Sequence, residues 1–358
     1  MYNNGVYTAT KIFTGEDWLH NHAIVVSNNC IDKILPIEQL LVPATKHFNC
    51  LIPGFIDIQI YGAQEKLFSV HPTINTLNAM YQHCLNNKTV YFLPTIATNT
   101  YEVIYSCIDA VMNYWIQGGQ GCLGLHIEGP WINPAKKGAH LQSLIHSPTV
   151  KEVENLLNYG KGIIKVITLA PEVCTPAMID LIHSYGIIIS AGHSNASFEE
   201  ATQFLNDGKV STVTHLYNAM SGLEHRAPGL VGATLHHSTV KASIIPDGHH
   251  VHFAAIAIAQ KIMGNRLFVI TDAVTTTSNG YYQHQLEGNK YTSNGTLSGS
   301  ALTMKQAVNN LVQYCNISLE EAFNMCSLYA AEAIGVENSL GKIEHGYEAA
   351  FVGWDSID

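Results

Sequence analysis

Four residues that can hold a metal ion or move a proton stand at the ends of short apolar runs in this sequence. They are Glu128, His193, His215 and Asp272. The runs are rich in Val, Ile and Leu, which is typical of buried parallel strands. In α/β folds the chemistry lies where strands end at their carboxyl side. Two imidazoles and two carboxylates at one rim therefore indicate a metal-dependent hydrolytic site.

Each of these residues also has a purely structural interpretation. Glu128 could form a salt bridge, a single histidine at a strand end is usually packed or solvated, and Asp272 could cap the next segment. Together, Glu128, His193 and His215 favour one divalent ion. Zn²⁺ is the first expectation, with Fe²⁺, Co²⁺ and Mn²⁺ as alternatives, because carboxylate and imidazole suit several metals. Asp272 could then take a proton from water and deliver it to a leaving group.

Further polar residues accompany these four. His126 lies two positions before Glu128, on the same face of the strand, and we expect it to orient the ligands from behind. Gln59 is a second candidate for that role. His140 and His250 follow the third and seventh expected strands and could polarise a carbonyl and hold substrate, although each alone could be a histidine in a surface loop.

The elements that must position these residues form a regular alternation. Strand-like segments cover residues 51–59, 89–95, 122–128, 163–171, 186–193, 211–215, 240–247 and 267–272. Helix-like stretches lie between them, such as 72–86, 101–116, 175–185 and 197–206. Eight alternations predict an α/β fold of the (β/α)8 TIM-barrel type rather than an open doubly wound sheet. No G-x-G-x-x-G motif follows the first strand, so a dinucleotide site has no support.

The ends of the chain read differently. Residues 6–13, 22–26 and 30–35 are short strand-like pieces separated by turn residues. We expect a small β-sandwich-like accessory domain from residues 1–50 plus about 336–358, to which the tail 341–354 could add a strand. The barrel would then cover residues 51–335. It includes a polar stretch at 275–295, a candidate for a moving lid, and helices at 301–314 and 319–334.

Composition excludes several classes of protein. The 358 residues carry 18 Lys+Arg against 28 Asp+Glu, a net charge of −10. Because no basic patch stands out, nucleic acid and anionic membranes are not expected partners. No signal peptide is evident, and no apolar run is long enough to span a bilayer. The eight cysteines include no CxxC pair, which suits reduced thiols and a cytoplasmic location.

Nine short motifs follow one another between residues 53 and 304. They read PGFID at 53–57, LHIEGPW at 125–131, KGAH at 137–140, GHSN at 192–195, THLYNAM at 214–220, PGLVG at 228–232, DGHH at 247–250, TDA at 271–273 and LSGSALTM at 297–304. In this order they resemble the N-acetylglucosamine-6-phosphate deacetylase family of the amidohydrolase superfamily. Any one motif is weak, but the ordered set is highly specific.

The resemblance implies an enzyme that releases acetate from N-acetylglucosamine 6-phosphate, giving glucosamine 6-phosphate in amino-sugar catabolism or recycling. It implies Glu128, His193 and His215 as metal ligands, Asp272 as catalytic acid/base and His140 as the residue that polarises the acetamide carbonyl. The implied substrate contacts are Ala139, His140, Asn218, Ala219, Arg226 and His250, with Leu297, Ser298 and Gly299 in a closing loop. It also implies a homodimer in which phosphate-binding residues can come from the neighbouring subunit.

Two departures from the family pattern matter. Two-metal members of the superfamily carry His-x-His at the end of strand one, where this chain has Gln59 and Tyr61, so we expect one metal per subunit. Tyr61 has no interpretation from sequence. The segment 346–350 is only loosely similar to the family's closing motif, so the small domain could be abbreviated.

Three alternatives stay open. The substrate could be the galactosamine epimer. The chain could be another amidohydrolase, although the missing His-x-His and Glu128 in place of a lysine disfavour a dihydroorotase. It could also be a non-catalytic barrel that serves assembly or binding, which would be expected to have lost part of the polar set.

Overall fold

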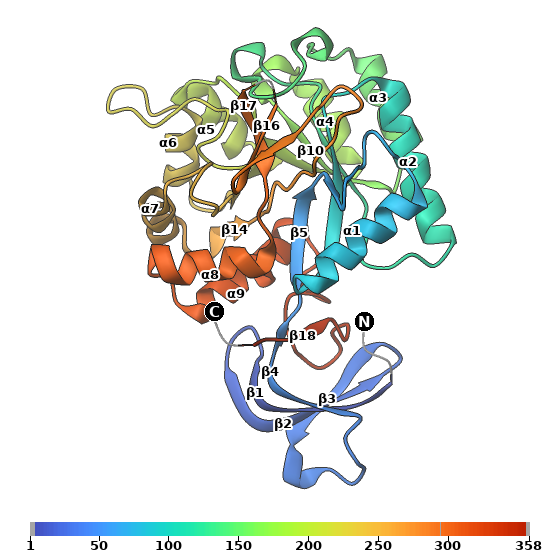
Figure 1. The fold of residues 1–358 in the computed structure, drawn as a ribbon. Coiled ribbons are helices and arrows are strands. Elements are labelled where there is room, and N and C mark those ends of the chain that lie inside the picture. Colours follow the sequence, from blue (N-terminus) through green and yellow to red (C-terminus); the bar gives the residue numbers. More distant parts are fainter. Residues whose placement is uncertain (1–3, 294, 356–358) are drawn as a thin grey trace.

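The computed structural model describes residues 4–293 and 295–355. Its centre is an eight-stranded parallel sheet in chain order (Figure 1). The strands are β5 (Phe55–Ile60), β8 (Thr89–Ala97), β9 (Leu125–Glu128), β10 (Ile164–Leu169), β11 (Ile188–Ala191), β12 (Val210–Val213), β13 (Lys241–Ile244) and β14 (Leu267–Val269). The chain after β14 closes the circle, because Asp272 N donates to Gln59 O and Tyr61 N donates to Ala273 O, both at 2.9 Å. The expected barrel is confirmed.

Helices surround this sheet, and Ser or Thr begins many of them. They are α1 (Ile74–Asn86), α2 (Tyr101–Ile116), α3 (Val150–Tyr159), α4 (Pro176–Ser184), α5 (Phe198–Asn206), α6 (Gly229–His236), α7 (Phe253–Met263), α8 (Met304–Cys315), α9 (Leu319–Cys326) and α10 (Leu328–Ala333). In α3 and α5, Thr149 and Ser197 form capping boxes with the glutamate three residues on. These caps satisfy N–H groups that a helix leaves unpaired at its start.

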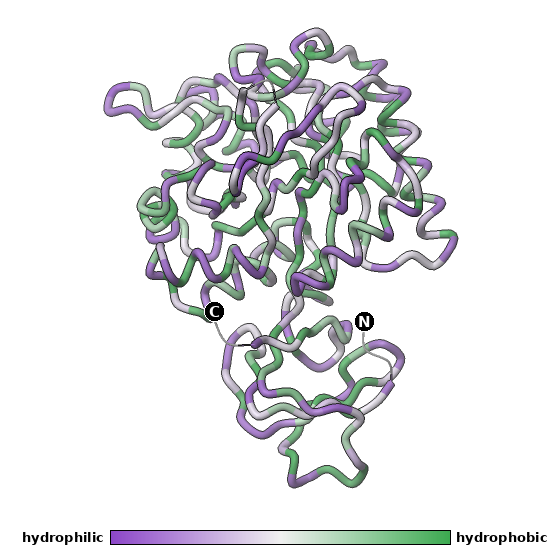
Figure 2. Tube along the Cα trace, viewed as in Figure 1, coloured by the Kyte–Doolittle hydropathy of each residue, from purple (hydrophilic) through white to green (hydrophobic). Residues whose placement is uncertain are grey.

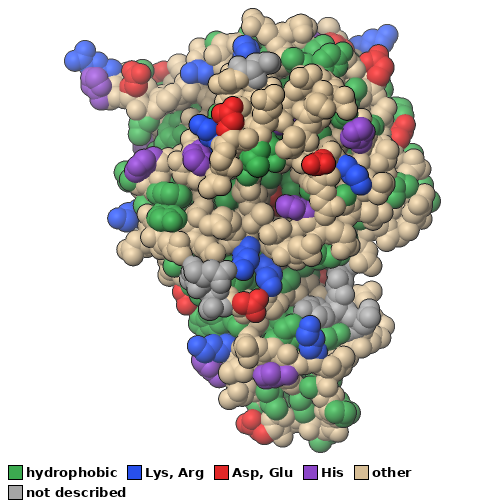
Figure 3. All heavy atoms as spheres, in the orientation of Figure 1, with side chains coloured by type: hydrophobic (Ala, Val, Ile, Leu, Met, Phe, Trp, Pro, Cys, Tyr) green, Lys and Arg blue, Asp and Glu red, His purple; other side chains and the backbone are tan. Residues whose placement is uncertain are grey.

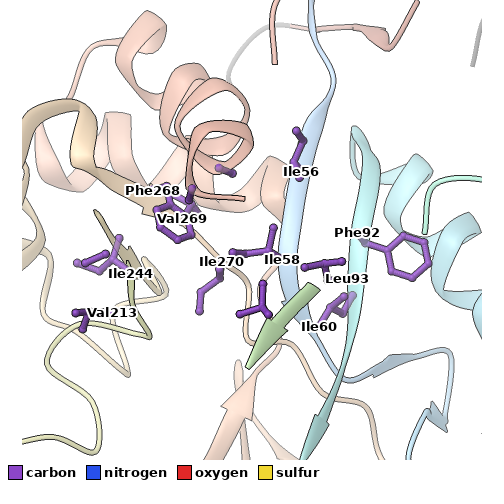
Figure 4. Packing of buried hydrophobic residues seen from close by; sticks show 14 of the residues in the cluster. Ile56, Ile58, Ile60, Phe92, Leu93, Val213, Ile244, Phe268, Val269 and Ile270 are labelled. Atoms are coloured by element: carbon purple, nitrogen blue, oxygen red, sulfur yellow. The ribbon is translucent and has the colours of Figure 1, made fainter. Parts of the chain in front are cut away.

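The barrel core follows from alternation along the strands. In β8, Phe92 points out toward the helices and stacks on Tyr81 of α1, with ring centroids 6.4 Å apart. Its neighbour Leu93 lies with Ile58 and Ile270 between the strands (Figure 4). Figure 2 shows hydrophobic segments through the barrel strands and hydrophilic residues on the outer loops. Burial on both faces explains why these strands read as continuous apolar runs.

A five-stranded sheet lies at the end of the barrel opposite the strands' carboxyl ends (Figure 1). Its order is β18 (Phe351–Gly353), β4 (Lys46–Pro53), β1 (Gly5–Phe13), β2 (Trp18–Ser27) and β3 (Cys30–Pro36). One face buries a small cluster that includes Tyr7, Ile24 and Phe351. The described residues of this unit form a single sheet, whose apolar face is covered in part by Ile343 and Ala349 rather than by a second sheet.

The strand expected over 51–59 is in fact two strands, and this is a correction. Leu51 belongs to β4, where it pairs with Ile12 and Gly353, and the barrel strand starts only at Phe55. Gly54 separates them, and a Cβ there would lie 2.4 Å from Val90 Cγ2. Because β4 runs past the expected boundary at residue 50, we propose that the two units divide at Gly54. Residues 1–3 and 356–358 of the expected small domain lie outside the described residues.

The polar stretch at 275–295 is not a plain loop. With the residues after it, it forms an antiparallel sheet of β15 (Gln285–Glu287), β16 (Lys290–Ser293) and β17 (Thr296–Ser300); residue 294 lies outside the described part of the chain. The expected closing loop 297–299 is therefore part of a strand. A further hairpin, β6 (Gly62–Ala63) and β7 (Lys66–Leu67), follows β5. Across the part of the chain that the structure describes, no helix is long and apolar enough to cross a membrane.

Candidate active site

A cavity of about 220 Å³ opens at the carboxyl ends of the barrel strands. Its walls include all four strand-end residues, Glu128, His193, His215 and Asp272, together with His140. All five side chains are at least nine-tenths buried. The structure therefore brings into one cavity residues that lie up to 144 positions apart (272 − 128) in the sequence.

Three of these residues have left-handed backbone conformations. The φ angles are 49° at His193, 37° at His215 and 53° at Asp272. Non-glycine residues rarely adopt such angles, which cost of order 1–3 kcal/mol each and cluster at functional sites. The tight turn before His193 depends on Gly192, where a Cβ would lie 2.6 Å from Thr168 Cγ2. The strand ends are bent so that these side chains enter the cavity.

Three donor atoms form a near-equilateral triangle. His215 Nε2 lies 3.0 Å from Glu128 Oε1 and 3.2 Å from His193 Nε2, and His193 Nε2 lies 3.3 Å from the same Oε1. A tetrahedral ion with ligand bonds of about 2.0–2.1 Å has ligand–ligand edges of about 3.3 Å. The triangle thus has the dimensions of one face of such a site.

Hydrogen bonds assign different tautomers to two of the histidines. His193 Nδ1 lies 2.8 Å from the Lys136 carbonyl oxygen, which can only accept, so Nδ1 carries the proton and Nε2 a lone pair. His140 is the reverse, because the Thr98 N–H donates to its Nδ1 at 3.3 Å. His140 Nε2 therefore carries a proton, which it donates to Glu128 Oε2 at 3.2 Å. The donor atoms of Glu128, His140 and His193 also lie within 4.8 Å of one another. His140 nevertheless presents a proton where a ligand needs a lone pair.

His215 adds a further sign that the group is built around a cation. Among the described residues its buried Nδ1 has no hydrogen-bond partner, while its Nε2 is pressed against Glu128 Oε1 and a second imidazole nitrogen. The lone pair of His193 Nε2 also faces Glu128 Oε1, a second acceptor, at 3.3 Å, which is unfavourable without positive charge between the two atoms. One carboxylate oxygen and two imidazole nitrogens suit Zn²⁺ and similar divalent ions, so these residues fit a metal.

The other side of Glu128 faces a compact polar group. Gln59 Nε2 donates to Asp272 Oδ1 at 2.8 Å and to Glu128 Oε1 at 3.1 Å, and the Tyr61 hydroxyl donates to Glu128 Oε2. Burial and then the Glu128 charge raise the pKa of Asp272 well above its usual value. Burial alone would raise the pKa of Glu128, but its contacts with His140, His193 and His215 hold it well below the usual value. The pKa values of Glu128 and Asp272 are thus shifted in opposite directions, a pattern typical of catalytic acid/base pairs.

His126 lies beneath the cavity and does not line it. Its Nδ1 lies 2.9 Å from the Ile58 carbonyl oxygen and its Nε2 lies 2.8 Å from Thr168 Oγ1. Burial lowers its pKa to about 4, so the ring is neutral. The described contacts of His126 tie β9 to β5 and β10 and do not include a direct bond to the predicted ligands.

The predicted substrate residues divide into two groups. Seven of them line the cavity besides His140: Ala139, Asn218, Ala219, His250, Leu297, Ser298 and Gly299. His250 is held by Asp247, whose Oδ2 lies 2.7 Å from its Nδ1. Arg226 is not brought to this cavity. It is exposed, in the loop between β12 and α6 that projects from the barrel at the upper left of Figure 1.

Comparison with known families agrees with this architecture. The model of the Amidohydrolase family matches residues 50–358, and that of the NagA composite domain matches residues 6–44. The chain belongs to the amidohydrolase family. Members of this family are metal-dependent, and the cavity holds a Glu/His/His cluster, Glu128 with His140 and His193. The triangle that Glu128 and His193 form with His215 is the candidate metal site of this amidohydrolase.

Individual relatives cover nearly the whole chain. N-acetylglucosamine-6-phosphate deacetylase of Haemophilus influenzae is 34% identical over 94% of this chain and 91% of its own length. N-acetylgalactosamine-6-phosphate deacetylase of Escherichia coli O157:H7 is 30% identical over 98% and 95%. The crystal structure of N-acetylglucosamine-6-phosphate deacetylase from Pasteurella multocida, 35% identical, superimposes with a TM-score of 0.91 over 97% of this amidohydrolase and 94% of that chain.

Several residues of the site escape sequence reasoning. Tyr282 and His284, from the segment before β15, line the cavity, where the Tyr282 hydroxyl donates to Thr98 O at 2.7 Å and His284 Nδ1 lies 2.9 Å from Ser298 Oγ. Leu67 contributes from β7, and Ser69 lies two residues beyond it. None of these stands at the end of a barrel strand, so no periodic signal marks them. Asp247, by contrast, stands in the DGHH motif and was within reach of sequence reasoning.

Proposed function

We propose that this amidohydrolase removes the acetyl group of N-acetylglucosamine 6-phosphate by metal-dependent hydrolysis, giving glucosamine 6-phosphate and acetate. The single observation that carries the proposal is the triangle of Glu128 Oε1, His193 Nε2 and His215 Nε2 beside a buried carboxyl group of raised pKa, Asp272. Relatives that share the whole chain are named for this reaction.

Glu128, His193 and His215 would hold one divalent ion per subunit. The ion would supply Lewis acidity toward the acetamide carbonyl and lower the pKa of a water molecule. We infer Zn²⁺ as the first choice, with Fe²⁺, Co²⁺ and Mn²⁺ as alternatives, because the ligand types suit all four. Gln59 orients Glu128 and Asp272 through the hydrogen bonds described above, whereas His126 supports the strands beneath them through Ile58 O and Thr168 Oγ1.

Two side chains supply the remaining chemistry. His140 lines the cavity, and its Nε2–H, which donates to Glu128 Oε2 at 3.2 Å in this structure, can be redirected to the substrate's carbonyl oxygen as negative charge develops there. Asp272 accepts the proton that the attacking water loses as its oxygen bonds to the carbonyl carbon. It then passes that proton to the departing nitrogen as the carbon–nitrogen bond breaks. The hydrogen bond from Gln59 to Oδ1 holds the carboxyl group in place.

The sugar phosphate would be held by further residues that line the cavity. We assign Asn218, Ala219 and His250 to the phosphosugar, and Ala139 with residues 297–299 to the boundary of the sugar site. Arg226 offers a planar fork suited to phosphate but lies on an exposed, projecting loop. We therefore propose a homodimer in which Arg226 reaches the cavity of the partner subunit.

The galactosamine epimer is a second candidate substrate. Two relatives of this chain are named N-acetylgalactosamine-6-phosphate deacetylase, at 30% and 35% identity, close to the 31–34% of the curated glucosamine enzymes. The two sugars differ at one hydroxyl. Lys, Arg, Asp and Glu side chains are scattered over the face in Figure 3. Because the distinguishing hydroxyl is uncharged, these charges do not favour either epimer. The eight free cysteines support a reducing, cytoplasmic location.

Acetate release tests the proposal. The purified chain is incubated with each 6-phosphorylated sugar and with unphosphorylated N-acetylglucosamine, and metal per chain is determined on the same sample. We expect turnover of N-acetylglucosamine 6-phosphate with about one metal per subunit. Preference for the other epimer would change the substrate assignment. Bound metal without cleavage of either phosphosugar would contradict the proposed reaction, and no metal with no turnover would favour a non-catalytic barrel.

A further inference from the structure

We propose that Tyr61 is a positioning residue that makes Glu128 a single-oxygen metal ligand. Its hydroxyl, together with His140, occupies Oε2 of the carboxylate and leaves only Oε1 to face His193 and His215. The inference rests on the proposed metal role of Glu128. It assigns a role to a residue for which the sequence alone offers none.

The two oxygens of Glu128 have unequal surroundings. Oε2 accepts the Tyr61 hydroxyl proton and the His140 Nε2–H, which occupy the two lone-pair directions of a carboxylate oxygen. Oε1 lies 3.1 Å from Gln59 Nε2, whose two N–H groups are shared among Oε1, the Tyr61 hydroxyl oxygen and Asp272 Oδ1. Its other direction faces the two imidazole nitrogens at 3.0 and 3.3 Å. Only Oε1 therefore has a lone pair free for an ion.

Gln59 sets the direction of the Tyr61 proton. Its amide nitrogen lies 2.8 Å from the Tyr61 hydroxyl oxygen, and an amide N–H can only donate. The hydroxyl oxygen therefore accepts from Gln59, and its own proton is directed to Glu128 Oε2. The same amide nitrogen contacts Asp272 Oδ1 at 2.8 Å. The Gln59 amide and the Tyr61 hydroxyl therefore direct hydrogen-bond donors into the space between Glu128 and Asp272, and these donors disfavour binding of a second cation there.

The tyrosine ring is held firmly. Its exposed fraction is 8%, and it packs in a cluster with Leu67, Val274, Tyr282 and Tyr291. The Tyr61 backbone is fixed on both sides, because its N donates to Ala273 O at 2.9 Å and its O accepts from Phe68 N at 2.8 Å. A hydroxyl on such a support is already in place before the metal arrives. Outer hydrogen bonds of this kind typically change metal affinity by 10–100-fold when removed.

The test compares two tyrosines of the same cluster. Tyr61→Phe removes the hydroxyl that contacts Glu128, whereas Tyr282→Phe removes one that donates to the Thr98 carbonyl instead. Zn²⁺ affinity is measured for each full-length variant by competition with a chromophoric chelator, and the melting temperature of the metal-free form is recorded alongside. We expect Kd to rise by roughly 10–100-fold for Tyr61→Phe. For Tyr282→Phe we expect a rise of less than about threefold, because no hydrogen bond to a ligand is lost.

A second variant covers the case in which Tyr61→Phe does not fold. Gln59→Leu removes the donor that directs the hydroxyl, and we expect it to weaken Zn²⁺ binding in the same direction. Unchanged affinity in the folded variants, equal losses at Tyr61 and Tyr282, or a wild type that binds no Zn²⁺ would each overturn the inference. Weaker binding in Tyr61→Phe, with no acetate released by the wild type, would support the positioning role while refuting the proposed reaction.

Discussion

Asp57 offers a quantitative test of how the barrel is closed beneath the site. The residue lies on β5 and is 1% exposed. Its Oδ1 accepts from the backbone N–H groups of Gln59 and Thr271, at 3.2 and 3.3 Å, and its Oδ2 accepts from the Thr271 hydroxyl. These bonds join the first strand to the residue before Asp272. Despite them, burial raises the pKa of Asp57 from its ordinary value of 3.8 to about 6.

The sign and size of the effect follow from proton linkage. Between pH 3.8 and about 6 the folded protein binds a proton at Asp57 that the unfolded chain has lost. The contribution of Asp57 to the free energy of unfolding therefore falls as pH rises through this window and is constant above it. A shift of about two pKa units at about 1.36 kcal/mol per unit gives a loss of about 3 kcal/mol. The neighbouring Cys84 and Cys326 thiols do not contribute, because burial raises their pKa values well above the usual range.

The measurement uses Asp57→Asn as the matched variant, because an amide of the same shape can keep the bonds to β5 and Thr271 without titrating. Urea unfolding of the metal-free proteins at pH 4 to 7.5 gives the difference in free energy of unfolding, wild type minus variant. We expect this difference to decrease by about 3 kcal/mol between pH 4 and 6.5. A difference that is constant with pH, or that increases with it, would refute the argument that Asp57 is destabilised by its own ionisation.

Three further predictions concern the site. Asp272→Asn keeps the oxygen that accepts from Gln59, so the variant should retain metal. Its kcat should fall by roughly 10²–10⁴-fold, because the group that carries the proton is removed. Near-normal turnover would exclude Asp272 as the acid/base. Arg226→Ala should raise KM for the 6-phosphorylated sugar by roughly tenfold or more, because a hydrogen bond to a charged group is worth about 1.5–3 kcal/mol. KM for the unphosphorylated sugar should not change. Equal effects on both KM values would place Arg226 away from the phosphate. Gly129→Ala should lower the free energy of unfolding by about 2 kcal/mol or more, because φ at this position is +76° and the new Cβ would lie 2.2 Å from the Thr98 hydroxyl oxygen. Turnover should fall as well, since that hydroxyl contacts His140. Wild-type stability in urea unfolding would contradict this prediction.

The barrel was predictable because buried parallel strands leave a strong sequence signal. Apolar runs ending in Glu128, His193, His215 and Asp272 marked both the strands and the rim. The start of the first strand was not predicted, because the end of β4, from Leu51, runs into β5 as one largely apolar stretch, and the close approach of Val90 to Gly54 marks the break. Periodicity carries no information about such a contact.

The surroundings of the metal position were less accessible. The unequal surroundings of the two Glu128 oxygens depend on which atoms of Tyr61, Gln59 and His140 contact each oxygen. Gln59 and Tyr61 come from the end of β5, which approaches Glu128 only in the folded barrel. Tyr282 and His284 reach the cavity because the segment before β15 packs over it. Contacts between distant segments of this kind have no local signature in the sequence.

Metal content of histidine variants tests the central claim most directly. Wild type, His215→Asn and His140→Asn are purified in the presence of Zn²⁺, and bound metal per chain is measured on each. The hydrogen bonds predict about one ion in the wild type, loss of the ion in His215→Asn, and retention in His140→Asn with loss of acetate release, because His140 Nε2 carries a proton. Retention in His215→Asn together with loss in His140→Asn would place the ion between Glu128, His140 and His193 and contradict the proposed site.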